Sequence, residues 1–422
     1  MRPKDRGATG IRYQKSGISK LRARPDAPLP MPDTRYLIPE ARPAVRALES
    51  SKIRDIANAG MHDPDVLAFW FGEPDQVTPA FIRDAASESL ARGETFYSQN
   101  FGIPELRDAI ADYVTALHRP ITAECVAATA SGMSALMLAT QVLVSPGDRV
   151  VVVTPLWPNL VEIPKILSAD VVCVPLRFET KGWTLDLDRL IDALSPGTRA
   201  LMINSPNNPT GWTIDRASQQ TLLAHCAKHG IWIVADDVYE RLHYAGNGAC
   251  APSFLDIADD EARIVSANSF SKAWLMTGWR LGWIVAPSTV MPDIGKLIEY
   301  NTSCSPVFVQ RAGVVALRDG EPTVDATRTR LRRARDRLVR ALSSLPGVDI
   351  ASPAGAMYAF FRLEGVDDSM AFCRALVQRA KLGLAPGRAF GPEGEGFVRW
   401  CFAATDERLD EGVARLARFL GR

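Results

Sequence analysis

Short apolar runs alternate with segments of helical spacing between Ala123 and Pro287. The runs are rich in β-branched residues, and in the segments between them apolar positions recur every three to four residues. Buried strands that alternate with helices indicate a mainly parallel sheet, covered by helices on both faces. The predicted strands are 150–153, 171–174, 200–203, 231–235 and 264–267.

The rest of the chain shows a different pattern. After Pro287, two long stretches of helical spacing lie at about 290–318 and 323–344, and a βαβ-like stretch begins near 348. The chain closes with an amphipathic helix at 406–419. We expect an α/β fold in which a smaller α+β domain accompanies the large sheet domain and recruits residues before about 80. The expected boundaries are an N-terminal arm at 1–36, small-domain segments at 37–80 and 319–422, and the large domain at 81–318.

Charge and cysteine content exclude several classes of partner. The 422 residues include 49 Lys and Arg against 48 Asp and Glu, so the net charge of +1 creates no field that selects nucleic acid or an anionic membrane. The seven cysteines are scattered without a C-x-x-C pair, which argues against a disulfide framework or a zinc site. Apolar runs fall far short of the roughly 18 residues of a membrane span. We expect a cytoplasmic protein with a small-molecule partner.

The arm at 1–36 is basic, with nine Lys or Arg, three Asp and a net charge of +6. It is rich in proline and lacks the apolar centre of a secretion signal, and its acidic residues argue against an organelle presequence. We interpret it as a solvated arm, with a position over a partner subunit as the alternative.

Unusual residues collect after the predicted strands, where parallel α/β sheets bind their ligands. Ser131, Gly132 and Met133 open a helix, so their N–H groups could hold a phosphate, although a plain helix start is the commoner reason for such a sequence. Trp157 follows the next strand and could either stack on a flat ring or fill the core.

Three further strand ends carry polar groups. The loop 204–211 contains three Asn and two Pro beyond a buried strand, where side-chain amides could bind a ligand, and an ordinary turn is the alternative. Asp236 ends a buried strand and needs a cation to offset the cost of burying its charge. Lys272 becomes a nucleophile where its surroundings lower its pKa, whereas on its own it is typical of a surface loop.

Taken together, these motifs resemble the class I/II, fold-type-I aminotransferases that depend on pyridoxal phosphate. The resemblance covers roughly residues 65–420, and seven motifs in the family's order do not arise by chance. The motifs are Gly72-Glu-Pro-Asp75, Tyr97 with Gly102-Ile-Pro-Glu-Leu106, Asn204-Ser-Pro-Asn-Asn-Pro-Thr-Gly211, Asp236-Asp-Val-Tyr239, Ser269-Phe-Ser-Lys272, Gly278-Trp-Arg280 and Phe397-Val-Arg399.

The resemblance implies pyridoxal phosphate as the cofactor and a role for each matching residue. Lys272 would form a Schiff base with the cofactor and later move a proton, and Asp236 would keep the pyridine nitrogen protonated. Tyr239 and Asn208 would bind the phenolic oxygen, and Trp157 would stack on the ring. The phosphate would be held by Ser131, Gly132, Met133, Ser269 and Arg280.

The same resemblance implies a substrate site in a homodimer. Arg399 would grip the substrate α-carboxylate, helped by the backbone of Gly72 and by Asn208. Tyr97 would reach the phosphate in the neighbouring subunit. Arg388 stands where many relatives carry a small residue, so it either meets the distal carboxylate of a dicarboxylic substrate or is a surface or interface charge. Further candidates for lining the substrate pocket are Trp70 and Trp274.

His225 and His229 stand four residues apart on a predicted helix, a spacing that could hold a metal. No constellation of carboxylates lies near them in the sequence. A solvated helix face is therefore the favoured interpretation, and no metal is expected.

These residues predict an aminotransferase that moves an amino group from an L-amino acid to a 2-oxo acid by a ping-pong Schiff-base mechanism. One alternative is another pyridoxal-phosphate reaction on the same scaffold, such as C–S β-elimination, because the motifs bind only the cofactor and a carboxylate. A second is a transcriptional regulator with an aminotransferase-like sensor domain, but the arm at 1–36 is too short and too rich in proline for the DNA-binding domain that it would need.

Overall fold

The computed structural model describes residues 41–179, 182–246 and 248–421. The predicted arm at 1–36 lies outside the described residues. Residues 44–422 form one compact unit, to which the elements below belong. Within the described ranges, no helix is both long enough and apolar enough to cross a bilayer.

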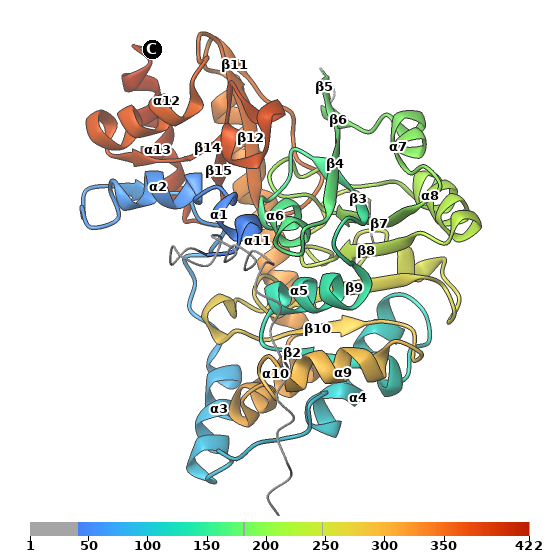
Figure 1. Cartoon of the computed structure of the whole chain (residues 1–422). Helices are drawn as coiled ribbons and strands as arrows, with labels where there is room; N and C mark the ends of the chain where they lie inside the picture. Colours follow the sequence, from blue (N-terminus) through green and yellow to red (C-terminus); the bar gives the residue numbers. More distant parts are fainter. Residues whose placement is uncertain (1–40, 180–181, 247, 422) are drawn as a thin grey trace, which may run out of the picture. The chain divides into compact units, whose positions relative to one another are not determined.

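A seven-stranded sheet forms the centre of the large domain (Figure 1). Neighbouring strands run parallel except at β10, which is antiparallel to both of its neighbours. All five predicted strands are present, and the predicted mainly parallel sheet is confirmed. In spatial order the strands are β2 (Val126–Thr129), β10 (Gly282–Val285), β9 (Ile264–Ser269), β8 (Trp232–Asp236), β7 (Thr198–Asn204), β3 (Arg149–Thr154) and β4 (Asp170–Pro175).

Side chains along β3 alternate between two apolar clusters, one on each face of the sheet. Val150 and Val152 belong to one cluster, whereas Val151 and Val153 belong to the other. All four are buried, so the strand is an unbroken apolar run. One cluster includes residues of α5 (Gly132–Leu143), α6 (Asn159–Ile166) and α9 (Met291–Glu299), and the other includes residues of α3 (Ala80–Ala91), α4 (Pro104–Leu117), α7 (Leu187–Ala193), α8 (Arg216–His229) and α10 (Val307–Asp319).

The stretch at 290–318, predicted as one long helical segment, forms two helices, α9 and α10. Residues 300–306 separate α9 from α10, and Pro306 is the N-cap of α10. A proline disfavours helical conformation in the residue before it, so the helix cannot run through Ser305. The second predicted stretch is confirmed as α11 (Glu321–Ser343).

The small domain contains a four-stranded sheet in the order β11 (Val348–Asp349), β12 (Tyr358–Leu363), β15 (Phe397–Cys401) and β14 (Ala385–Pro386). Every neighbouring pair is antiparallel. Both β12 and β14 are antiparallel to β15, which lies between them, so they are parallel to each other but do not pair. The predicted βαβ-like stretch is therefore corrected: its two parallel strands are separated by an inserted third strand.

A third apolar cluster packs against this sheet. It contains Ile56 and Phe69 from the N-terminal part of the unit together with residues of the C-terminal part. The exact domain boundaries stay predictions. The predicted closing helix is confirmed as α13 (Asp406–Phe419). The other elements are α2 (Lys52–Asn58), α12 (Ser369–Ala375), the parallel pair β1 (Leu67–Ala68) and β13 (Leu382–Gly383), and the antiparallel pair β5 (Arg177–Glu179) and β6 (Gly182–Thr184).

Candidate active site

A cavity of about 410 Å³ lies at the carboxyl ends of the parallel strands, where such sheets bind ligands. Asn204, Asp236 and Ser269, the last residues of β7, β8 and β9, all line it. The cavity brings together every predicted site residue except Ser131 and Tyr97. Those that line it are Gly72, Gly132, Met133, Trp157, Asn208, Asp236, Tyr239, Ser269, Lys272, Arg280 and Arg399.

Lys272 extends into this cavity from the loop after β9. Its Nζ donates a hydrogen bond to the backbone oxygen of Gly72 at 2.5 Å. Burial lowers the pKa of Lys272 to about 8, and the nearby Arg399 acts in the same direction. About one tenth of the amine is therefore neutral at pH 7, far more than for an ordinary lysine, and the neutral form is the one that acts as a nucleophile and a proton acceptor.

Asp236 is a buried carboxyl, 3% exposed, at the end of β8. It accepts the backbone N–H of Val238 at 3.3 Å, and among the described residues it forms no ion pair. Burial raises the pKa of Asp236 to about 7. A cationic ring nitrogen facing this carboxyl would favour its ionised form, so the site fits a protonated pyridine.

Tyr239 and Tyr358 form a buried pair at the cavity wall. Their hydroxyl oxygens lie 2.7 Å apart, and burial raises the pKa of Tyr239 well above its ordinary value. The ring of Tyr358 also lies under the guanidinium of Arg399, with 4.4 Å between the guanidinium carbon and the ring centre. Both hydroxyls stay protonated at neutral pH, so this pair can donate a hydrogen bond to a ligand oxygen.

Arg399 is a buried arginine, 2% exposed, and forms no ion pair with a carboxylate of the described part of the chain. Its Nη1 donates to Asn208 Oδ1 at 2.9 Å, and Nη2 donates to the backbone oxygen of Trp70. Its Nε is buried and has no hydrogen-bond partner among the described residues. A buried guanidinium with spare donors and no anion fits a substrate carboxylate.

Four of the lining residues suit a phosphate. Gly132 and Met133 lie at the N-terminus of α5, Ser269 packs against Gly132, and Arg280 lines the same cavity. The backbone is tightly packed there, because a Cβ on Gly282 would lie 2.5 Å from the backbone nitrogen of Gly132. Backbone N–H groups at a helix start, a hydroxyl and a guanidinium form a suitable set of donors for an anion.

Two predicted residues lie apart from the cavity. The hydroxyl of Ser131 accepts the N–H of Ser134 at 3.0 Å, so its side chain serves as the N-cap of α5. Tyr97 is 91% exposed and lines a separate surface hollow. It therefore contributes nothing to the cavity of its own chain.

Three further candidates for lining the substrate pocket do not line this cavity. Arg388 is exposed and lines another cavity, because the 3₁₀ turn Gly387–Phe390 buries Phe390 beside Arg399 and leaves Arg388 outside. Trp70 is buried against Gly383, and only its backbone reaches the site. Trp274 is likewise a core residue, 2% exposed, among other aromatic rings.

The predicted histidine pair lies on α8, with 4.6 Å between the ring centres of His225 and His229. His225 Nε2 lies 2.9 Å from the backbone oxygen of Leu194. One ring nitrogen of His225 is thus already engaged within the protein.

Several residues of the cavity were not predicted. Tyr358 comes from β12, and Arg54 and Phe71 come from the N-terminal part of the unit. Asn204 was placed only as part of its motif, yet its amide donates to the backbone oxygen of Asp236 at 3.0 Å and its Oδ1 accepts the N–H of Asn208 at 2.8 Å. It thus joins the ends of β7 and β8.

Comparisons with known proteins agree with this geometry. The family model for aminotransferase class I and II matches residues 64–416. The aspartate aminotransferase of Pyrococcus horikoshii is 35% identical over 390 residues, which cover 92% of this chain and 98% of that protein. The arginine–pyruvate transaminase of Pseudomonas aeruginosa is 33% identical over 84% of this chain and 89% of its own length.

A solved structure of the Thermus thermophilus aspartate aminotransferase with maleate has a TM-score of 0.83 to this chain at 30% identity. The match covers 90% of this chain and all of that one. The chain belongs to the class I and II aminotransferase family. It is a pyridoxal-phosphate-dependent aminotransferase with the type I fold, which confirms the predicted fold class, enzyme class and cofactor.

Proposed function

We propose that the cavity binds pyridoxal phosphate and an amino-acid donor with an acidic side chain. When bound, the cofactor supplies the electron sink for the bond that breaks at the substrate Cα. One observation carries the proposal: a lysine with a lowered pKa, a buried carboxyl and a buried arginine that forms no ion pair within the described chain all line a single cavity.

Each residue has a role that follows from its contacts. Lys272 attaches the cofactor and moves the proton at the substrate Cα, because its amine is partly neutral near pH 7. Asp236 holds a proton on the pyridine nitrogen, and Tyr239 donates to the phenolic oxygen. Arg399 orients the substrate through its α-carboxylate, with Asn208 steadying the guanidinium. The phosphate is held by Gly132, Met133, Ser269 and Arg280, with Ser131 capping their helix, and Trp157 covers the ring.

The absorbance of the bound cofactor tests this proposal. With L-aspartate or L-glutamate alone, we expect the visible band of the cofactor to disappear in one turnover and to return when a 2-oxo acid is added. Release of pyruvate from a cysteine thioether without any added oxo acid would instead indicate the β-elimination alternative. A protein that stays colourless with pyridoxal phosphate would contradict the proposed site.

The charges around the cavity support an acidic donor. Four cationic side chains line it, and among the described lining residues Asp236 is the sole acid. The phosphate uses Arg280, the α-carboxylate uses Arg399, and Lys272 is joined to the cofactor. Arg54 of α2 has no such assignment, and no carboxylate of the described chain pairs with it. Its guanidinium carbon lies 5.4 Å from the centre of the Phe71 ring. The Thermus thermophilus relative, named for aspartate, is described with maleate, a dicarboxylate.

Replacing Arg54 with alanine is therefore expected to raise KM for acidic donors about tenfold, since a hydrogen bond to a charged group is worth about 1.5–3 kcal/mol. KM for alanine or a similar neutral donor should not change. Initial rates over a panel of donors measure the effect. Arg388→Ala is the matched control, because Arg388 lies in another cavity, and it should change neither KM. An equal effect of Arg54→Ala on acidic and neutral donors would contradict the assignment.

A homodimer completes the proposal. Phe96, Tyr97 and Tyr300 are 83%, 91% and 90% exposed, a poor arrangement for aromatic rings in water. Val77 is 75% exposed in a hollow that also contains Arg280, the proposed phosphate ligand. An apolar surface next to the phosphate end supports a partner subunit whose own Tyr97 reaches that phosphate.

All seven cysteines are free thiols, which supports a cytoplasmic location.

A further inference from the structure

The turn after β8 directs its side chains to two opposite sides. Asp236 and Tyr239 line the cavity. Asp237 and Glu240 do not line it, and both are buried, 4% and 5% exposed. The turn is closed by a hydrogen bond from the Glu240 N–H to the Asp237 backbone oxygen at 2.9 Å. Whatever holds these two buried carboxyls therefore also holds the two side chains that face the cofactor.

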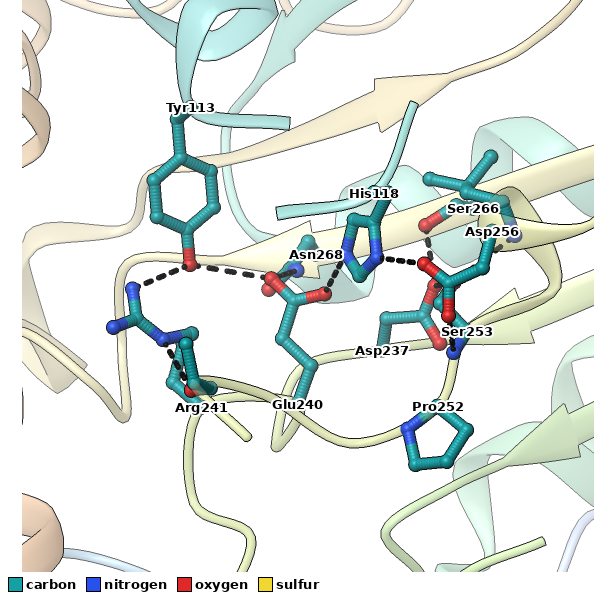
Figure 2. Close-up of polar contacts among 12 residues, drawn as sticks. Tyr113, His118, Asp237, Glu240, Arg241, Pro252, Ser253, Asp256, Ser266 and Asn268 are labelled. Carbon is teal, nitrogen blue, oxygen red and sulfur yellow. Dashed lines mark hydrogen bonds and ion pairs between the residues drawn. The ribbon is translucent and has the colours of Figure 1, made fainter. Parts of the chain in front are cut away.

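Donors from two other elements bind the two carboxyls (Figure 2). On β9, Ser266 Oγ donates to Asp237 at 2.6 Å, and the Asn268 amide donates to Glu240 at 2.7 Å. On α4, the Tyr113 hydroxyl donates to Glu240 at 3.3 Å. The side of the turn away from the cavity is thus a buried polar network, and its parts polarise one another.

His118, at the C-terminus of α4, lies at the centre of this network (Figure 2). Its side chain is 1% exposed, with Nε2 3.1 Å from Glu240 and Nδ1 2.6 Å from Asp256 of the short helix η3 (Phe254–Asp256). Ionised carboxylates only accept hydrogen bonds, so both ring nitrogens must donate and the ring is a cation. Burial opposes this charge, but the hydrogen bonds that His118 donates to Asp256 and Glu240 outweigh it and raise the pKa of His118 to about 10.

The surrounding charges show what this cation balances. Four acids surround it: Asp237, Glu240, Asp256 and, on α11, Glu321. The other cations are Arg241 on the turn and Arg216 on α8. Tyr113 and Cys250 are neutral, because burial raises the pKa of each. When all four acids are ionised, negative charges exceed positive charges by one if His118 is charged and by two if it is neutral. Burial and the repulsion from Glu240 already raise the pKa of Asp237 to about 7.

We propose that His118 is a positioning residue for Asp236 and Tyr239: as a buried cation between Glu240 and Asp256, it fixes the turn that carries both side chains to the cofactor. The inference rests on the role proposed above for Asp236. His118 does not line the cavity and touches neither cofactor nor substrate. Without its charge, Glu240 loses its ion pair and keeps only the neutral donors Asn268 and Tyr113, whereas Asp256 still pairs with Arg216. The excess of buried negative charge would displace the turn and make Asp236 harder to ionise.

His118→Gln tests the proposal, because an amide can donate to one of the two carboxylates and carries no charge. We expect the apoenzyme to bind pyridoxal phosphate about tenfold more weakly in an absorbance titration, the size of effect typical of supporting residues around a bound group. The pH midpoint of the visible absorbance of the bound cofactor should also shift upward, because a less ionised Asp236 holds less positive charge on the ring. His225→Gln on α8 is the control and should change neither.

A structural role alone would lower the melting temperature of His118→Gln and leave both the Kd and the pH midpoint at the wild-type values, which would overturn the proposal. If His118→Gln does not fold, Tyr113→Phe removes the hydrogen bond to Glu240, and with it the one that the hydroxyl accepts from Arg241, without changing the charge of the network. It should weaken cofactor binding two- to threefold, and an unchanged Kd would overturn the proposal. If the wild-type protein binds no pyridoxal phosphate, the function proposed for the cavity fails, whereas normal binding by both variants contradicts only the role of His118.

Discussion

Lys272→Ala is expected to abolish amino transfer. A positioned general base alone contributes about 10²–10⁴-fold to a rate, and Lys272 also provides the covalent attachment, so we expect kcat to fall by about 10⁴-fold or more. The variant should stay folded, because the truncated side chain points into a cavity and loses a single hydrogen bond, to Gly72. It should still bind pyridoxal phosphate without a covalent bond, since the other cofactor contacts do not involve this side chain.

Reduction with sodium borohydride separates the two functions of this lysine. The treatment should fix the cofactor to the wild-type chain and leave Lys272→Ala unlabelled, as read by mass spectrometry. Lys296→Ala is the control, because Lys296 is exposed on α9 and, within the described part of the chain, pairs only with Asp293. Labelling of Lys272→Ala at another lysine, or a loss of activity below tenfold, would show that a different amine does the chemistry.

The residues that the sequence places correctly follow strands of one parallel sheet. Asp236 and Ser269 are the last residues of β8 and β9, and Lys272 follows three residues later. Parallel strands end at the same edge, so short contiguous motifs that lie far apart along the chain must meet there. This geometry explains why Lys272 and Asp236, the proposed catalytic lysine and pyridine partner, could be expected in one cavity without coordinates.

The residues that were missed or misplaced depend on pairing and on turn geometry. Tyr358 reaches Tyr239 only because β12 pairs with the inserted strand β15, with Phe360 opposite Arg399, a register that no local motif encodes. Arg54 arrives on α2, whose position depends on packing within the small domain. For Arg388 the sequence leaves a substrate contact and a surface charge open, because a single 3₁₀ turn decides that Phe390 is buried and Arg388 is exposed. His118 was missed because a lone histidine at a helix end gives no signal until its two carboxylates are in place.

Arg399→Lys is expected to lower kcat/KM for amino-acid donors by about 30- to 5000-fold, since disrupting a buried, hydrogen-bonded charge pair costs about 2–5 kcal/mol. The planar guanidinium uses two nitrogens to hold Asn208 and the Trp70 backbone and still has Nε free, whereas an ammonium offers one nitrogen and cannot reproduce this fork. The guanidinium carbon also lies 4.4 Å from the ring centre of Tyr358 and 4.8 Å from that of Phe390, contacts that suit a flat cation.

The loss should depend on the substrate carboxylate and not on the cofactor. Steady-state rates with an amino acid and with the corresponding amine that lacks the α-carboxylate separate the two, because only the amino acid should lose rate in Arg399→Lys. The Kd for pyridoxal phosphate should stay at the wild-type value. Arg374→Lys, which alters an exposed pair with Asp55, is the matched control and should behave like the wild type. An equal loss with the amine would mean that Arg399 maintains the shape of the cavity instead of binding the carboxylate, because its buried contacts to Asn208 and Trp70 would then account for the whole effect.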